Sequence, residues 1–217
     1  FTKDPSEIVK ELEAKGYVFD QSNAKNNVLT DGATYDNDST VHQYFRYYFK
    51  HGTTHTDTNS NQADKKTVSE TIHYVYKDGV KAGKSAAKDY TTAVTFKRGY
   101  TTDNVTGKIV SYDPWTVDSK QADSKTFDAV KSPVIAGYTA DQAEVAAQTV
   151  TPKSEAVVKT VNYTADAQEA QAIFYDETTG KEINGTREIA TGKSDEAINF
   201  TKDPSEIVKE LEAKGYV

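Results

Sequence analysis

The spacing of apolar residues near the N-terminus predicts a short amphipathic helix. Ile8, Val9 and Leu12 fall on one stripe, and the residues between them are charged, as in a helix with one buried face. Three apolar side chains cannot stabilise a helix of this length alone. We therefore expect the helix to pack on a sheet.

The ends of this helix also carry sequence signals. Asp4 is a favoured N-cap, Pro5 suits the first helical position, and Glu7 completes a capping-box pattern. Gly16 predicts a left-handed C-terminal cap. The helix should begin at Pro5 and end just before Gly16.

Other segments alternate between apolar and polar residues, which is typical of strands with one buried face. In the predicted strand 41–50, one face carries Val41, Phe45, Tyr47 and Phe49, and the other carries His42, Tyr44, Arg46, Tyr48 and Lys50. Further inward positions are Val68, Ile72, Tyr74, Tyr76, Val94, Phe96, Val157, Val161 and Tyr163. Asp78-Gly79 and Asn184-Gly185 are hairpin signals between strands.

An exact internal repeat dominates the organisation. Residues 1–18, FTKDPSEIVKELEAKGYV, recur unchanged at 200–217, an offset of 199 residues from Phe1 to Phe200. This predicts a tandem array with a period near 199, of which the chain is one period and a short overhang. A deliberately engineered duplication is the alternative.

A fainter repeat divides the period into two modules. Gly16-Tyr17 has a counterpart in Gly137-Tyr138, and the segment beginning at Ile72 resembles that beginning at Ile173. The predicted domains are the second half of one module (1–50), a linker (51–65), a complete second module (66–167) and the first half of the next module (168–217). The first module would thus be split between the two ends of the chain.

The order of these elements predicts a strand-rich α+β fold. One helix crossing a small mixed sheet between hairpins is the order of a β-grasp, or ubiquitin-like, module. The middle module has no comparable helix pattern, so we expect it to be mostly β. The whole would be an elongated tandem of such modules.

Composition narrows the class of protein. Hydrophobic residues make up 36% and aromatic residues 11%, with 14 Tyr, no Cys and no Met. The absence of Cys and Met, the two sulfur-containing residues that are readily oxidised, favours an extracellular site. The net charge of −7 comes from mixed acids and bases, which disfavours nucleic-acid binding. No apolar run approaches the roughly 20 residues of a membrane span.

The predicted strand 41–50 offers one candidate binding surface. His42, Tyr44, Arg46 and Tyr48 share a face; aromatic rings stack on sugar rings, and Arg can pair with acidic sugar groups. The alternative is that this face packs against the helix or a neighbouring module. Trp115 is a second candidate, either as an exposed platform or, more in keeping with its residue type, as a core residue.

The metal-like patterns are weaker. Asp31, Asp36 and Asp38 could hold a structural Ca²⁺, but they lack EF-hand order, so a polar turn is preferred. His51 and His55 have the spacing of zinc ligands on a helix, yet they fall in the predicted linker. There is no Cys nucleophile and no serine in a nucleophile-elbow context, so no enzyme is expected and no cofactor is required.

Longer patterns carry a specific resemblance. The segment from Ile173 (IFYDETTGK), the helix ending in KGY and the segment from Val41 (VHQYFRYYFKH) resemble the mucus-binding (MucBP) domain of lactobacillus surface adhesins. TIHYVY, TFKR, DPW, SPVIAGY and VNY, in that order, resemble the second module of the same long repeats. The resemblance implies β-grasp modules, mucin glycan binding, association with immunoglobulins and sortase anchoring to the cell wall outside this segment.

Three functions therefore compete. The first is a repeat of an extracellular bacterial adhesin that binds host mucin glycans weakly per unit and strongly through many copies. The second is capture of immunoglobulin by strand-edge pairing, and the third is a passive stalk spacer. The split end modules also predict head-to-tail association between molecules.

Overall fold

The computed structural model describes residues 3–217, so Phe1 and Thr2, which begin the first repeat copy and the predicted domain 1–50, lie outside the described residues. This part of the chain is strand-rich and has two short α-helices, in agreement with the predicted α+β class. It divides into two compact units, the first running to Thr67 and including Val94–Lys125, the second comprising Val68–Ala93 and Thr126–Val217. The two units are described separately.

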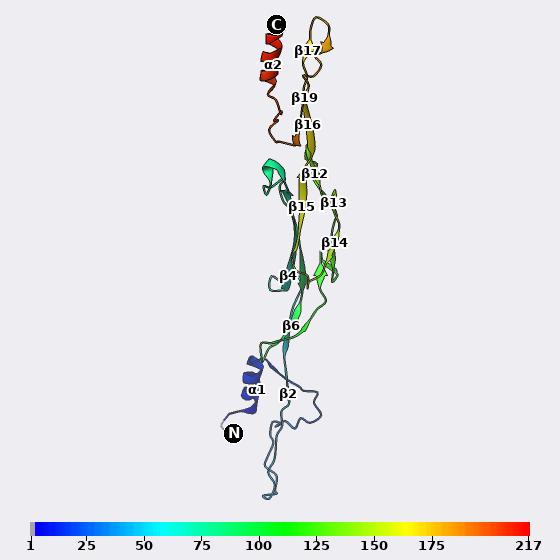
Figure 1. Cartoon of the computed structure of the whole chain (residues 1–217). Helices are drawn as coiled ribbons and strands as arrows, with labels where there is room; N and C mark the ends of the chain where they lie inside the picture. The colour runs from blue at the N-terminus through cyan, green and yellow to red at the C-terminus, as the bar shows by residue number, and fades with distance from the viewer. Residues whose placement is uncertain (1–2) are drawn as a thin grey trace. The chain divides into compact units, whose positions relative to one another are not determined.

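The first unit contains the first helix and several short strands. Its elements are α1 (Pro5–Ala14), β1 (Tyr17–Phe19), β2 (Phe49–His51), β3 (Thr53–Thr56), β6 (Tyr100–Asp103), β7 (Ile109–Tyr112), β8 (Thr116–Val117) and β9 (Lys120–Gln121). β1 pairs with β2, β6 lies between β3 and β7, and β8 pairs with β9. Figure 1 labels α1, β2 and β6 of this unit. The strands β4 (Asp64–Tyr76), β5 (Tyr90–Arg98) and β10 (Lys125–Phe127) have residues in both units.

The helix α1 begins and ends where the sequence predicts. Asp4 is the N-cap with Pro5 after it, and Gly16 has a φ of +93°. The Asp4 carboxylate accepts a hydrogen bond from the Ser6 amide at 2.7 Å. The predicted capping-box pairing with Glu7 is replaced by this bond, because the short Asp side chain reaches the nearer amide.

The strand predicted over 41–50 is mostly absent, and this prediction is wrong for its first eight residues. Only Phe49–His51 forms β2, and upstream of it Arg46 makes an isolated antiparallel bridge with Asn27. A strand is defined by its pairing as well as by its side-chain pattern. Among the described residues, the backbone from Val41 to Phe45 has no continuous partner strand.

The segment predicted as a linker, 51–65, contains regular structure. Thr53–Thr56 forms β3, which pairs antiparallel with β6, and Asp64 begins the long strand β4. The three threonines of β3 suit a strand, but the sequence pattern contains no signal for a partner 44 to 50 residues away. The pairing with Tyr100–Asp103 supplies that partner.

The second unit contains the remaining strands and the second helix. Its elements are the 3-10 helix η1 (Gly79–Lys81), β11 (Val130–Lys131), β12 (Tyr138–Ala140), β13 (Glu144–Val145), β14 (Gln148–Val150), β15 (Val157–Ala165), β16 (Ala167–Ala172), β17 (Tyr175–Asp176), β18 (Lys181–Glu182), β19 (Glu188–Lys193) and α2 (Pro204–Ala213). β15 lies between β12 and β4 and pairs with β4 in parallel, from Val157 opposite Glu70 to Tyr163 opposite Tyr76.

The buried side chains confirm the alternation read from the sequence. The predicted inward positions Val68, Ile72, Tyr74, Val94, Phe96, Val161 and Tyr163 are all buried. In the second unit, Ile72, Tyr74, Val161 and Tyr163 form one core cluster together with Tyr138 and Val145. Tyr76 and Val157, at strand ends, are half-buried.

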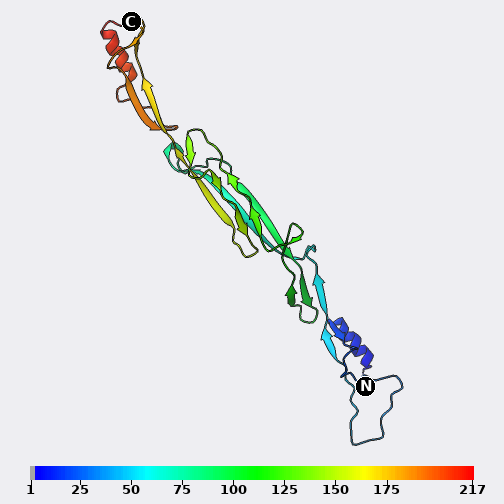
Figure 2. The same cartoon turned by 90° about the vertical axis from the view of Figure 1, so that its right-hand side faces the viewer.

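The C-terminal part of the second unit is a hairpin followed by α2. β16 pairs antiparallel with β19 from Ala167 opposite Lys193 to Ala172 opposite Glu188. Gly185, in the predicted Asn-Gly turn between β18 and β19, has a φ of +78°. Figure 2 shows α2 beside this hairpin.

Candidate binding surfaces

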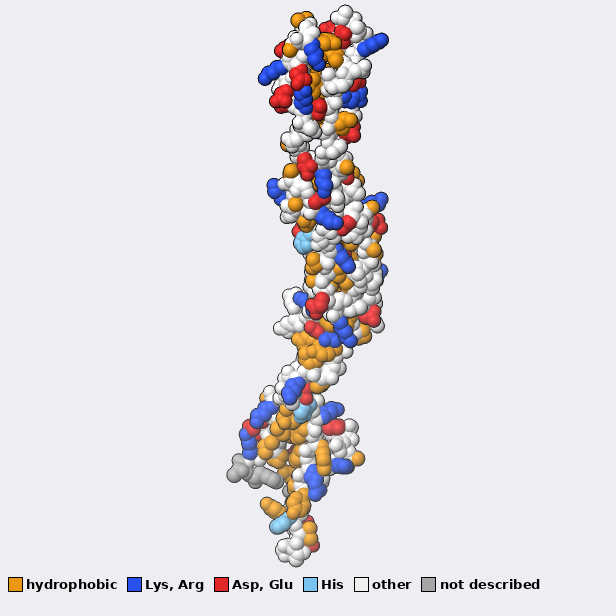
Figure 3. Space-filling model, in the orientation of Figure 1, with side chains coloured by type: hydrophobic (Ala, Val, Ile, Leu, Met, Phe, Trp, Pro, Cys, Tyr) orange, Lys and Arg blue, Asp and Glu red, His pale blue; other side chains and the backbone are white. Residues whose placement is uncertain are grey.

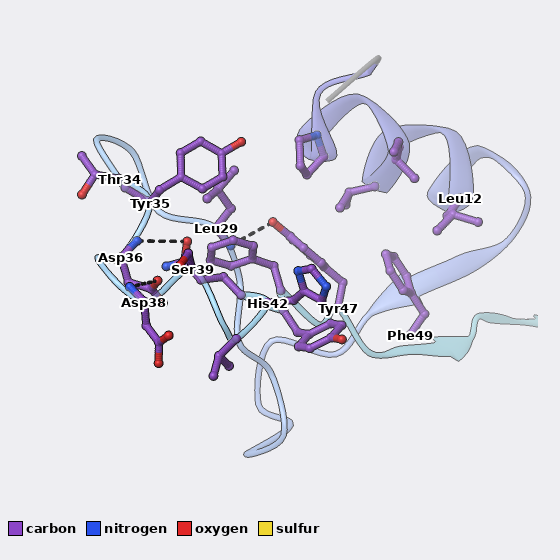
Figure 4. Close-up of a pocket in the computed structure, with 18 residues that line it drawn as sticks. Leu12, Leu29, Thr34, Tyr35, Asp36, Asp38, Ser39, His42, Tyr47 and Phe49 are labelled. Carbon is purple, nitrogen blue, oxygen red and sulfur yellow. Dashed lines mark hydrogen bonds between the residues drawn. The ribbon is translucent and has the colours of Figure 1, made fainter.

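A groove of about 980 Å³ lies in the first unit between α1 and the segment from Leu29 to Phe49. The helix contributes Ile8, Val9 and Leu12 (Figure 4). The facing chain contributes polar residues together with five aromatic ones, which are Tyr35, Tyr44, Phe45, Tyr47 and Phe49. The Tyr47 hydroxyl accepts a hydrogen bond from the Leu29 amide at 3.0 Å, which holds one wall. Figure 3 shows hydrophobic side chains exposed on the part of the chain that holds α1.

Three of the four predicted aromatic and cationic residues come together, and two of them, His42 and Tyr44, line this groove. The Tyr44 side chain is 60% exposed, and the Arg46 guanidinium carbon lies 5.6 Å from its ring centroid. His42 meets the same ring edge-on at 6.4 Å between centroids. Tyr48 is only half-buried, and its amide donates to Asn26 Oδ1 at 2.9 Å. The structure therefore brings together His42, Tyr44 and Arg46 as an exposed cluster.

The aspartates of the same loop are engaged in turns. The Asp38 amide donates to Asp36 Oδ1 at 3.1 Å, and the Thr40 amide donates to Asp38 Oδ1 at 2.9 Å. Hydrogen bonds from the Thr40 hydroxyl, which is the larger cause, and from the Thr40 amide lower the pKa of Asp38. Among residues 3–217, no three or more His, Cys, Asp or Glu side chains are grouped so that they could hold a metal ion. Asp31, Asp36 and Asp38 therefore form no such group.

The two histidines with metal-like spacing point to different carboxylates. His51 Nδ1 lies 2.7 Å from Asp103 Oδ2, and His55 Nε2 lies 2.9 Å from Asp113 Oδ2. The Asp103 pKa is lowered to about 2, first by the His51 hydrogen bond and then by the Thr106 and Val105 amides. The first pair links the end of β2 to the end of β6. The second pair links β3 to the residue that follows β7.

Trp115 is half-buried, and its ring is already engaged. The guanidinium carbon of Arg98 lies 4.2 Å from the Trp115 ring centroid and 3.6 Å from that of Tyr112. Arg98 Nε also donates to Asp64 Oδ2 at 2.7 Å. The sequence contains no signal that places Arg98 between these rings, so this stack could not be predicted. Trp115 is neither a fully buried core residue nor an open platform.

Family models match both parts of this architecture. A model described as a Muc B2-like domain matches residues 59–167, half of the chain. A model described as a mucin binding domain matches residues 1–51 and again 168–217. The same domain model is therefore found at both ends of the chain.

Solved structures agree. The chain is 47% identical to the structure titled Mub-RV, with a TM-score of 0.58, over 76% of this chain and 83% of the other. The chain is a mucus-binding repeat. The repeat is also 33% identical to a type 2 repeat of the mucus binding protein MUB from Lactobacillus reuteri, with a TM-score of 0.53 and the same coverage of 76% and 83%. The comparison with curated proteins finds no match.

The family settles the broad class of activity. A mucus-binding repeat is an adhesion module and not an enzyme, as the sequence predicts. Its two described α-helices, ten residues each, have neither the length nor the apolar character to cross a membrane.

A polar network joins the hairpin of the repeat to the core of the second unit. The Tyr138 hydroxyl donates to Asp195 Oδ2 at 2.8 Å, and Lys81 Nζ lies 2.6 Å from the same oxygen. Asp78 accepts from the Ala165 amide at 2.8 Å and also pairs with Lys193. The hydrogen bonds from Lys81 and Tyr138 lower the pKa of Asp195. These residues are structural, and none belongs to the predicted binding set.

Proposed function

We propose that the repeat binds host mucin glycans at the cell surface, through the cluster of His42, Tyr44 and Arg46. The observation that supports this is the exposure of the Tyr44 ring beside a guanidinium and an imidazole. An exposed aromatic face stacks on sugar rings, and the Arg46 guanidinium pairs with sialate carboxylates or sulfates. Membership of a mucus-binding family supports mucin as the partner.

Each contact of this kind is weak, and affinity arises from repetition. The exact 199-residue offset between the two copies of residues 1–18 supports a tandem array. Once one repeat is engaged, its neighbours bind at high effective concentration, which raises avidity by roughly 10²–10⁴-fold. In this proposal the array is extracellular and is anchored to the cell wall by other parts of the parent protein.

The test is a mucin glycan array probed with one repeat and with a tandem of repeats, using Tyr44→Ala and Arg46→Ala variants. Both variants should lose at least about tenfold in mucin binding and keep the melting temperature of the parent. Tyr175→Ala is the matched control, because Tyr175 is 63% exposed and lies outside the cluster. Unchanged binding of the Tyr44 and Arg46 variants would refute the site.

A second candidate is capture of immunoglobulin by strand-edge pairing. The observation in its favour is the backbone of Val41 to Phe45, which has an extended side-chain pattern and no continuous partner strand among the described residues. Main-chain pairing of this kind does not depend on sugars. Free mucin oligosaccharides should displace a glycan contact and leave an edge-paired immunoglobulin bound. If neither mucin glycan nor immunoglobulin binds, the repeat acts as a passive spacer.

A further inference from the structure

The two copies of the repeated segment have the same helix but different surroundings. Ile207 of α2 is 3% exposed and Leu211 is 7% exposed. The equivalent residue Ile8 of α1 is 42% exposed, and no residue of α1 is buried. Because the two sequences are identical, the difference comes entirely from what lies against each helix.

The hairpin that precedes α2 accounts for its burial. β16 and β19 present Ala170, Ala172 and Ala190 on one face, and Ala190 is buried. The Lys202 amide donates to the Glu188 carboxylate at 3.3 Å, which ties the start of α2 to β19. Figure 2 shows α2 along this hairpin. The face of α2 that carries Ile207 and Leu211 is therefore covered from within the second unit.

The other helix is covered on a different side. Val9 is half-buried, whereas its counterpart Val208 is 43% exposed. α1 leads directly into β1, which pairs with β2. The hairpin thus covers the isoleucine side of the helix, and the closing strands leave that side open. The open side is the groove of about 980 Å³.

We infer that the groove beside α1 is the docking site for the β16–β19 hairpin of a second copy of this sequence. In a tandem array with the 199-residue offset, such a hairpin directly precedes each copy of the helix, as it precedes α2 here. The mucin binding domain model matches the hairpin with its helix and, separately, the helix with its closing strands. One docked hairpin completes one module with a single helix.

Docking between two separate chains requires an exchange of helices. The hairpin already holds its own α2, so α1 of the second molecule must replace it. The hairpin loses its contacts with α2 and forms the same contacts with α1. Because the two helices have the same sequence, this exchange leaves the free energy of the helix-to-hairpin contacts unchanged. The gain is burial of the aromatic wall of the groove, including Phe45, Tyr47 and Phe49, and a partner strand for the backbone of residues 41–45. The cost is release of α2 and the loss of its local attachment.

The identical sequences supply an unusually well matched pair of variants. Ile207→Asp weakens the hold of α2 on its hairpin and frees the hairpin for exchange. Ile8→Asp makes the same change in the same local sequence but places a charge in the groove. Sedimentation equilibrium of the full 217-residue chain should show concentration-dependent association that Ile207→Asp strengthens roughly tenfold to a hundredfold and Ile8→Asp abolishes.

A milder variant guards against unfolding. Ile207→Ala should strengthen association in the same direction with both helices retained by circular dichroism, and the double variant Ile8→Asp/Ile207→Asp should be monomeric. Hydrogen exchange should show the amides of residues 41–45 becoming protected as Ile207→Asp associates.

Three outcomes overturn the proposal. They are association of Ile8→Asp equal to that of the parent, no strengthening by either Ile207 variant, and displacement of the second copy by free mucin oligosaccharide, which would place a glycan in the groove. The comparison of the Ile8 and Ile207 variants is made without mucin, so its failure leaves the proposed glycan contact at Tyr44 standing.

Discussion

The two copies of the repeated segment separate what local sequence determines from what tertiary neighbours determine. The N-caps Asp4 and Asp203 have φ and ψ of −63° and 133° and of −61° and 128°, and both C-caps have −90° and 5°. Each copy also forms the same ion pair, Lys3 with Glu11 and Lys202 with Glu210. Helix, caps and surface pairs are therefore local properties. Burial is not, since Ile8 and Ile207 differ more than tenfold in exposure.

The largest expected effect tests that contrast in packing. Leu211→Ala should destabilise the docked α2 by about 2–5 kcal/mol, because a buried leucine is replaced by a cavity. Leu12→Ala should cost about half as much, since Leu12 is only half-buried. Hydrogen exchange of the amides in each helix measures both. Equal costs would show that the two helices are packed alike.

A smaller effect distinguishes the two glycines that end the helices. Gly16 and Gly215 have φ of +93° and +92°, so alanine is strained at both by about 1–2 kcal/mol. Only at Gly16 would the added Cβ lie 2.5 Å from the Asn104 carbonyl oxygen; at Gly215 nothing lies within 4 Å. Gly16→Ala should therefore cost about 1–3 kcal/mol more than Gly215→Ala. Urea unfolding of the two variants gives the comparison, and identical midpoints would contradict it.

The smallest effect concerns acid. It involves His51, at the end of β2, whose hydrogen bond to Asp103 helps lower the pKa of that carboxyl from 3.8 to about 2. A carboxyl whose pKa is lowered by folding stabilises the folded state at any pH above its pKa in the unfolded state. For Asp103 this stabilisation is lost as the pH falls from 3.8 to about 2.

The corresponding variant is His51→Ala. It should melt lower than the parent at pH 5 by roughly 2–4 °C or less, and the gap should close as the pH is lowered to about 2. His42→Ala, which lacks a carboxylate partner in the described structure, should show no such pH-dependent gap. If the difference in melting temperature between the parent and His51→Ala stays the same at low pH, the hydrogen bond to Asp103 is not its cause.

The sequence predicted those parts of the fold that depend on neighbours along the chain. Asp4, Pro5 and Gly16 located the helix, and the period-two positions from Val68 to Tyr163 located the core. Two predictions that depended on a distant partner failed. The first eight residues of the strand predicted at 41–50 lack a continuous partner strand, and the segment at 51–65 has one in β6.

The candidate site shows the same division. His42, Tyr44 and Arg46 gather because alternate residues of an extended chain share a face, which the sequence displays directly. The Tyr48 backbone amide donates to the Asn26 side chain, and the Trp115 ring contacts Arg98, a residue 17 positions earlier. Neither contact has a periodic signal. Trp115 could be assigned only when the path of β5 and of the loop before β8 was known.

The parallel pairing of β4 with β15 has a mechanical consequence. The chain enters this ladder at the start of β4 and leaves it at the end of β15, and because the strands are parallel these two points lie at opposite ends of the seven residue pairs. A pull transmitted along the chain therefore loads the ladder in shear, so its hydrogen bonds must fail together and cannot open one at a time as in a zipper. Resistance to such a pull is set by the unfolding rate. A surface protein exposed to flowing fluid would keep this unit folded while its contacts hold.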